Sequence, residues 1–294
     1  MNSVTRTAPR GRMIPLPGRG GEMSALEFGP VDRPVDVVFS HANGYNAATY
    51  RSILQPLADA FRILALDMRG HGASTLPTVI EGREGWPTFR DDLLVLIASA
   101  CEAPVVLAGH SMGGTASLLA AAAAPERVRA LALFDPVIVP AAAQADEDAM
   151  RASPLALGAA RRRATFTSRQ AAVDAYRGRG GFKTWSDEQL ADYVDGGFRE
   201  TPEGEVTLAC RPEWEASNFA THNYDGIAAF RASRCPIRIL RAAEGSTCRI
   251  EGYEDELRAT GRIDVQVVPG TTHFLPMERP ELVRETLRGV LAAT

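Results

Sequence analysis

The sequence contains little cysteine, and the cysteines it has lie far apart. Cys101, Cys210, Cys235 and Cys248 form no CxxC pair, and no histidine stands at metal-ligand spacing from them. A disulfide framework or a structural zinc site needs clustered cysteines. We therefore expect reduced thiols, a cytoplasmic protein and no metal site.

Long hydrophobic runs and long blocks of one charge are also absent. The longest apolar run, residues 118–124, is far shorter than the roughly 20 residues that a membrane helix needs. The 36 acidic and 32 basic residues are mixed along the chain and give a formal net charge of -4. We expect neither a membrane span nor a nucleic-acid partner. The oligomeric state stays open.

What the chain has is an alternation of short β-branched runs and longer amphipathic stretches. Its 294 residues, 45% of them apolar, can bury a large core. Strands are expected at 35–39, 61–66, 105–108 and 131–134, and helices at 50–60, 87–101 and 112–124. This alternation is typical of a mostly parallel sheet with helices on both faces.

The rhythm changes after residue 140. Residues 141–232 show helical periodicity and almost no strand-like run, and the alternation then resumes with 236–240, 253–259, 265–268 and 280–293. We expect an α/β core made of residues 23–140 and 233–294, interrupted by a helical cap at 141–232. Residues 1–22, which contain Pro, Gly and Arg but no apolar signal-peptide core, are expected to form a flexible leader.

The strongest local signal is a glycine-rich turn around Ser111. Gly109 and Gly113 flank this serine two positions away on either side, with a buried strand before the turn and a helix after it. Such a tight turn exposes the hydroxyl group and needs small neighbours. The pattern predicts that Ser111 is a nucleophile.

A serine hydroxyl needs a base to remove its proton. His273 follows the last expected strand, at the same end of the parallel sheet as Ser111. The other four histidines lie in loops, beside the serine or in the inserted segment. We therefore predict that His273 is the general base.

A second loop at this end of the sheet predicts an oxyanion hole. Residues 40–45 follow the strand at 35–39 and are rich in small, turn-forming residues. The backbone N–H groups of Asn43 and Met112 are the expected donors to the oxygen that becomes negative during acyl transfer.

Together these motifs resemble the α/β-hydrolase superfamily of serine hydrolases with a helical cap. The resemblance covers about residues 23–293 and rests on the segments 40–44, 67–72, 109–114, 134–136 and 273–280. It implies an eight-stranded, mostly parallel sheet, a cap after the sixth strand, no cofactor, and a structural role for the turn at 67–72.

The acid that would orient His273 is left open between two residues. Most of the superfamily carries an Asp in the loop after the seventh strand, but residues 241–248 contain none. Glu244 lies in that loop, whereas Asp135 follows the sixth strand, a position that some branches use. One helix and one strand separate Ser111 from Asp135, which favours Asp135; Glu244 is the alternative acid.

The residues expected to line the substrate pocket are scattered aromatic residues that share no motif. Tyr45, Trp214 and Phe274 are candidates for an apolar lining, although core packing is the simpler interpretation of Trp214. The adjacent Arg161, Arg162 and Arg163 point in different directions on a helix, so a solvated face is expected.

The sequence therefore predicts an enzyme that cleaves a carboxylic ester or lactone of a small, apolar molecule through an acyl-enzyme on Ser111. A serine at this turn argues against dehalogenase and epoxide hydrolase chemistry, which use Asp there in this fold. A carbon–carbon bond hydrolase, a cofactor-free lyase or oxygenase, and a small-molecule receptor with little turnover remain alternatives.

Overall fold

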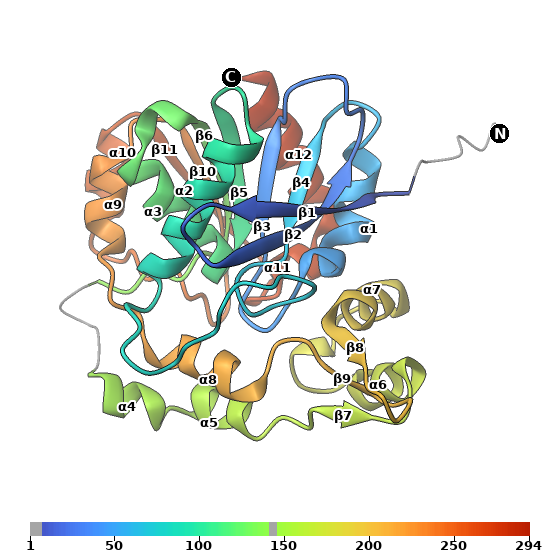
Figure 1. Ribbon diagram of the computed structural model, residues 1–294. Coiled ribbons are helices and arrows are strands. Elements are labelled where there is room, and N and C mark those ends of the chain that lie inside the picture. Colours follow the sequence, from blue (N-terminus) through green and yellow to red (C-terminus); the bar gives the residue numbers. More distant parts are fainter. Residues whose placement is uncertain (1–7, 141–145) are drawn as a thin grey trace.

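The protein is described from a computed structural model, which covers residues 8–140 and 146–294 (Figure 1). Its centre is an eight-stranded sheet in the order β1-β2-β4-β3-β5-β6-β10-β11. β1 and β2 pair antiparallel, as do β2 and β4, and all other neighbours pair parallel. The expected eight-stranded, mostly parallel sheet is confirmed.

The strands of this sheet begin and end within a few residues of the expected positions, apart from the first two. They are β1 (Arg10–Leu16), β2 (Gly21–Phe28), β3 (Val37–Ser40), β4 (Ile63–Leu66), β5 (Val105–His110), β6 (Val128–Phe134), β10 (Ile237–Ala242) and β11 (Ile263–Val268).

The helices follow the strands as expected for crossover connections. Those of the core are α1 (Arg51–Leu54), α2 (Pro87–Ala100), α3 (Met112–Ala123), α10 (Glu254–Ala259), α11 (Leu275–Glu278) and α12 (Pro280–Ala292). The expected helix at 50–60 is broken instead into α1 and two 3-10 turns, Ala47–Tyr50 and Gln55–Leu57. Pro56, at the start of the second turn, removes a backbone donor, which accounts for the break.

Side chains of alternate residues in each strand enter opposite cores. On β3, Val38 packs with α2 and α3, whereas Val37 and Phe39 pack with α1 and α12. All three side chains are at most 1% exposed. A strand buried on both faces is continuously apolar, which is why the parallel strands could be recognised in the sequence.

The expected flexible leader is wrong for the residues that the structure describes. β1 is an edge strand whose residues pair antiparallel with β2, from Arg10 opposite Glu27 to Leu16 opposite Gly21. The side chains of Ile14 and Leu16 are buried in the core, whereas the arginines of β1 remain at the surface. Residues 1–7 lie outside the described residues.

The segment between β6 and β10 contains α4 (Glu147–Arg151), α5 (Pro154–Ala160), α6 (Arg169–Tyr176), α7 (Asp187–Gly197), α8 (Pro212–Ala220) and α9 (Gly226–Ala232). The part from α4 to α8 lies below the sheet in Figure 1, beyond the carboxyl ends of the parallel strands, whereas α9 packs beside α3 of the core.

This segment is not purely helical, contrary to expectation. β7 (Thr165–Phe166), β8 (Phe198–Glu200) and β9 (Val206–Leu208) form a small antiparallel sheet in the order β7-β9-β8. Strands of two or three residues are too short for a sequence period to reveal. The first residues of the expected cap, 141–145, lie outside the described residues. Within the described part of the chain, no helix is long and apolar enough to cross a membrane.

Candidate active site

Ser111 stands at the turn between β5 and α3. Its backbone has φ 55° and ψ -122°, a conformation that is unusual for a residue with a side chain. A Cβ atom on Gly113 would lie 2.2 Å from the carbonyl oxygen of Ser40, and one on Gly109 would lie 2.5 Å from the carbonyl carbon of Gly113. Both glycines are therefore required by close backbone approach.

His273 lies beside Ser111 after β11. Its Nε2 atom is 2.9 Å from Oγ of Ser111, and its Nδ1 atom is 2.7 Å from Oδ2 of Asp135. The structure thus brings together three residues that are far apart in the sequence. In this arrangement Nδ1 carries the proton that is donated to the carboxylate, which leaves Nε2 free to accept the serine proton.

Asp135 is held by the loop that follows β10. Its carboxylate accepts hydrogen bonds from the backbone N–H of Ala242, the hydroxyl of Ser246 and the backbone N–H of Thr247. Burial raises the pKa of Asp135, but the hydrogen bond and charge of His273 and these other donors outweigh it, so the pKa is lowered. The carboxylate is therefore ionised when His273 becomes positively charged.

Glu244 does not join this group. Its side chain is exposed, and it forms no hydrogen bond or ion pair with His273 within the described residues. Its backbone N–H donates to the carbonyl of Thr271. Of the two carboxylates left open by the sequence, Asp135 is the one that contacts His273.

The backbone N–H groups of Asn43 and Met112 have no acceptor among the residues that the structure describes. Both residues belong to segments at the site: Met112 follows Ser111 at the start of α3, and Asn43 lies in the loop after β3. The Asn43 side chain donates to the carbonyl of Glu215 and accepts from Asn218, which fixes the loop. Unpaired buried N–H groups are rare, so these two are available to a ligand.

Two buried histidines anchor the same loop. His71 Nε2 accepts from the backbone N–H of Gly44, and His41 Nε2 accepts from that of Met68. Burial lowers the pKa of both imidazoles, to about 4 for His71, so both are neutral acceptors at neutral pH. These contacts agree with the structural role that the resemblance implied for the turn at 67–72.

His110 links the serine turn to the loop that carries His273. Its Nε2 atom donates to the carbonyl of His273 at 2.7 Å, and its Nδ1 atom accepts from the hydroxyl of Tyr50 at 2.8 Å. Tyr50 in turn accepts from the backbone N–H of Ala42. Burial, and then the charge of His273, lower the pKa of His110 to about 3, so this chain of hydrogen bonds contains a neutral imidazole.

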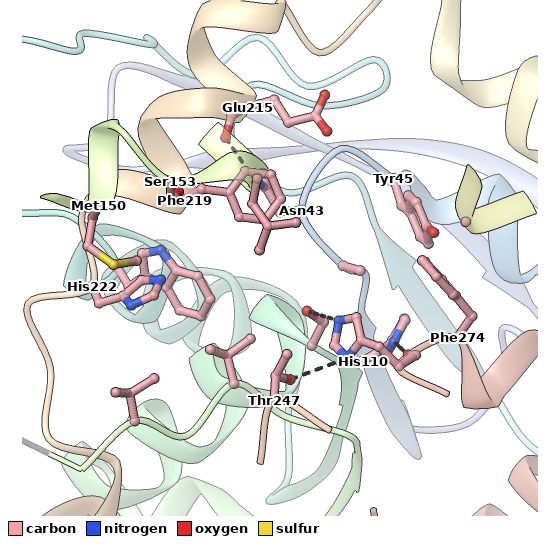
Figure 2. A pocket seen from close by; sticks show the side chains of 18 of the residues that line it. Asn43, Tyr45, His110, Met150, Ser153, Glu215, Phe219, His222, Thr247 and Phe274 are labelled. Carbon is pink, nitrogen blue, oxygen red and sulfur yellow. Dashed lines mark hydrogen bonds between the residues drawn. The ribbon is translucent and has the colours of Figure 1, made fainter. Parts of the chain in front are cut away.

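Ser111 and His273 open onto a cavity of about 550 Å³. Figure 2 shows Met150, Ser153 and His222 on one side of it, and Tyr45 and Phe274 on the other. Its apolar wall includes the side chains of Trp86, Val137, Val139, Phe182 and Phe219. The expected lining residues Tyr45 and Phe274 are therefore in place.

Trp214, the third expected lining residue, is not part of the cavity wall. Its indole N–H donates to the carbonyl of Arg69, and the guanidinium of Arg83 stacks over its ring at 4.3 Å. Its side chain is only 2% exposed. The prediction of a lining role was wrong because Trp214 joins the inserted segment to the core.

Arg162 was expected on a solvated face and is instead a half-buried part of the cavity wall. It pairs with Glu215 at 2.5 Å and donates to the hydroxyl of Tyr193. Trp86, Phe219, His222 and Arg249 also line the cavity and were not predicted. They come from separate segments with no shared motif, so only the folded chain brings them together.

The comparison with protein families agrees with this geometry. The model described as the alpha/beta hydrolase family matches residues 37–286. The chain belongs to this family. The serine turn, the loop after β3 and His273 all lie within the matched range, and among the described residues no group of side chains forms a metal site.

Individual members of the alpha/beta hydrolase family show the extent of the similarity. The chain is 25% identical over 260 residues to 2-(acetamidomethylene)succinate hydrolase of Mesorhizobium japonicum, covering 87% of this chain and 88% of that protein. It is 38% identical to the lipase LipV of Mycobacterium tuberculosis, but over only 49% of this chain and 53% of that protein.

A solved structure of E-2-(acetamidomethylene)succinate hydrolase superposes with a TM-score of 0.79 at 22% identity, covering 97% of this chain and 99% of that one. This likeness establishes the fold. Membership of the family makes hydrolysis the expected class of reaction, and the bond and substrate are considered below.

Proposed function

We propose that this protein is a serine hydrolase that forms an acyl-enzyme on Ser111. The observation that carries the proposal is the continuous chain of contacts from Ser111 Oγ through His273 to Asp135, at 2.9 Å and 2.7 Å. The two unpaired N–H groups of Asn43 and Met112 complete the set of groups that acyl transfer needs.

In the first half of the reaction, Ser111 Oγ attacks the carbonyl carbon of the substrate while its proton passes to His273 Nε2. The carbonyl oxygen becomes negative, and the N–H groups of Asn43 and Met112 donate hydrogen bonds to it. Asp135 remains ionised and stabilises the positively charged imidazole through Nδ1.

The tetrahedral intermediate then collapses. His273 gives its proton from Nε2 to the leaving group, whose bond to the carbonyl carbon breaks, and the acyl group stays on Ser111. In the second half, His273 takes a proton from water as the water oxygen attacks the acyl carbonyl. His273 then gives this proton to Ser111 Oγ as the bond between Oγ and the acyl carbon breaks. This step regenerates the enzyme and releases the acid.

The inserted segment acts as a cap over the substrate in this proposal. Met150, Phe219 and other residues of the segment line the cavity together with Trp86 and Val137 of the core. A mostly apolar enclosure of this size favours a small molecule with an apolar body, such as a carboxylic ester or a lactone.

A second candidate is hydrolysis of the kind carried out by 2-(acetamidomethylene)succinate hydrolase. That protein is similar along nearly the whole chain, whereas the lipase is similar along half of it. The same serine, base and oxyanion donors also serve a substrate other than an ester, including one whose carbon–carbon bond is cleaved. The two candidates share the acyl-enzyme and differ in the leaving group.

The experiment that separates these candidates is a burst-phase assay with p-nitrophenyl esters of increasing acyl length, set beside 2-(acetamidomethylene)succinate. The parent protein and Ser111→Ala are compared. Ester turnover with a burst, lost in Ser111→Ala, supports the first candidate. Turnover of 2-(acetamidomethylene)succinate with little ester turnover supports the second.

A further inference from the structure

One wall of the cavity is built by two segments that lie side by side and are joined by a single β-bridge. Ile138, after β6, forms a parallel bridge with Cys248, after β10, and Arg249 donates its backbone N–H to the carbonyl of Ile138. Ile138 and Cys248 are fully buried in the core. At such a bridge the side chains of the preceding and following residues point to the opposite side of the chain.

The cavity contacts follow this alternation. Val137 and Val139 line the cavity on either side of Ile138, and Thr247 and Arg249 line it on either side of Cys248. Thr247 is next to the reacting groups, with its hydroxyl 3.3 Å from Nδ1 of His273. Arg249 therefore lies on the same wall, two residues after the threonine that contacts the base.

The charges of the cavity lining do not balance. Arg162 and Glu215 form a partly buried ion pair with each other, whereas the guanidinium of Arg249 has no hydrogen bond or ion pair with any described residue. The lining has no other charged side chain within the described residues. Arg249, which is exposed, is thus the charged residue of the described lining that is left without a partner.

Arg249 and His222 both line the cavity, and the charge of Arg249 acts on His222. Burial first, and then the charge of Arg249, lower the pKa of His222 to about 4. A neutral imidazole at this place retains one ring N–H as a donor. Ser153, whose hydroxyl oxygen accepts from the backbone N–H of Ala156, lies on the same side (Figure 2).

We propose that Arg249 binds an anionic group of the substrate, a carboxylate, at the His222 side of the cavity. This inference rests on the proposed function and names its substrate class: an acyl compound with an apolar body and a carboxylate remote from the reacting carbonyl. A guanidinium binds a carboxylate with two parallel hydrogen bonds, which suits recognition at a cavity rim.

The spacing along the wall sets the size of the substrate. Thr247 contacts His273, and Arg249 lies two residues further along the chain, so the carboxylate site and the reacting carbonyl are separated by a short aliphatic chain. Adipate meets this requirement. A neutral ester of the same length fills the cavity but leaves Arg249 without a partner.

The test compares p-nitrophenyl hydrogen adipate with its neutral methyl ester, p-nitrophenyl methyl adipate. A second pair, 4-carboxyphenyl hexanoate and phenyl hexanoate, carries the charge on the leaving group instead. The proteins are the parent, Arg249→Gln, the charge-retaining Arg249→Lys, and Arg258→Gln as a control. Arg258 is an exposed arginine of α10 that does not line the cavity.

In at least one of the two substrate pairs, we expect Arg249→Gln to lower kcat/KM for the anionic ester about tenfold, mainly by raising KM. The value for the neutral ester of the same pair should be unchanged. Arg249→Lys should retain part of the preference, and Arg258→Gln all of it. Raising the salt concentration should reduce the advantage of the anionic ester in the parent. Equal changes for anionic and neutral esters in both pairs would overturn the inference.

Binding gives a second measurement that needs no turnover. The dissociation constant of p-nitrophenyl hydrogen adipate is measured by calorimetry on Ser111→Ala and on Ser111→Ala/Arg249→Gln. A tenfold weaker affinity in the double variant supports the carboxylate site even if no ester is hydrolysed, and equal affinities of the two proteins for this ester and for 4-carboxyphenyl hexanoate overturn it. Hydrolysis of the neutral ester by the parent reports on the proposed function separately.

Discussion

The Oδ2 atom of Asp135 lies 2.7 Å from Nδ1 of His273, although Asp135 follows β6 and not β10. The loop after β10 contributes hydrogen-bond donors instead: Ser246 and Thr247 both bind the carboxylate of Asp135. The carboxylate thus comes from the end of β6, and the groups that hold it in place come from the end of the neighbouring strand β10. This division explains why a loop without Asp is compatible with the rest of the site.

The first prediction distinguishes the two carboxylates. Asp135→Asn should lower kcat by about 10²- to 10⁴-fold, because an amide does not stabilise the charged imidazole or enforce its tautomer. Glu244→Gln is the matched control and should have parental activity, since its side chain is exposed. Equal losses in both variants, with circular dichroism showing intact folds, would remove Asp135 from its proposed role.

The second prediction concerns Tyr50, whose hydroxyl connects Ala42 to His110. Tyr50→Phe leaves buried polar groups unpaired, which should cost about 1–3 kcal/mol of unfolding free energy. Because His110 holds the carbonyl of His273, kcat should also fall, by about tenfold, with KM little changed.

The control for this variant is Tyr253→Phe, at a half-buried tyrosine before α10 that lies away from the cavity lining. It should have parental kcat. A Tyr50→Phe protein that loses stability but keeps its kcat would show that the hydrogen-bond chain supports only the fold.

The third prediction is a contrast between two glycines. Gly113→Ala should lower the free energy of unfolding by about 3 kcal/mol or more, since its Cβ would lie 2.2 Å from the carbonyl oxygen of Ser40. Gly289→Ala, in α12 with no atom within 4 Å of the added Cβ, should raise it by about 0.5–1 kcal/mol. Urea unfolding measures both changes.

The fourth prediction is loss of stability in acid. His71 and His110 have folded-state pKa values of about 4 and about 3, below the roughly 6.5 of an unfolded chain. Between these values the unfolded state binds more protons than the folded state, so the free energy of unfolding falls as the pH is lowered from about 6.5 towards 4.

At pH 5 each of these two histidines should reduce stability by about 2 kcal/mol relative to pH 7. Urea unfolding at both pH values gives the difference, and His71→Gln should make it smaller. A difference that stays the same in this variant would mean that His71 does not take up a proton on unfolding.

Much of the core and of the candidate site could be predicted from sequence patterns. Ser111 and His273 were found because a buried strand, a glycine turn and a helix are all local features, and because parallel topology brings strand ends together. The choice between Asp135 and Glu244 needed the positions of two loops in space. The distance between two loops leaves no periodic pattern in the sequence.

The parts that sequence reasoning missed have physical causes. β1 contains arginines and a proline because it is an edge strand with one exposed face, so its pattern resembled a leader. Arg162 lies half-buried in the cavity wall because Glu215, 53 residues away, neutralises it. The positions of Trp214 and of the cavity wall around Val137 depend on how the inserted segment packs against the core. A single sequence does not specify this packing.

The most direct test of the central claim is the intact mass of the protein after reaction with a fluorophosphonate, followed by peptide mapping. We predict one adduct on Ser111 in the parent, no adduct in Ser111→Ala, and much slower labelling in His273→Gln. Labelling of another residue, or an adduct that persists in Ser111→Ala, would contradict the proposed role of Ser111 as the nucleophile.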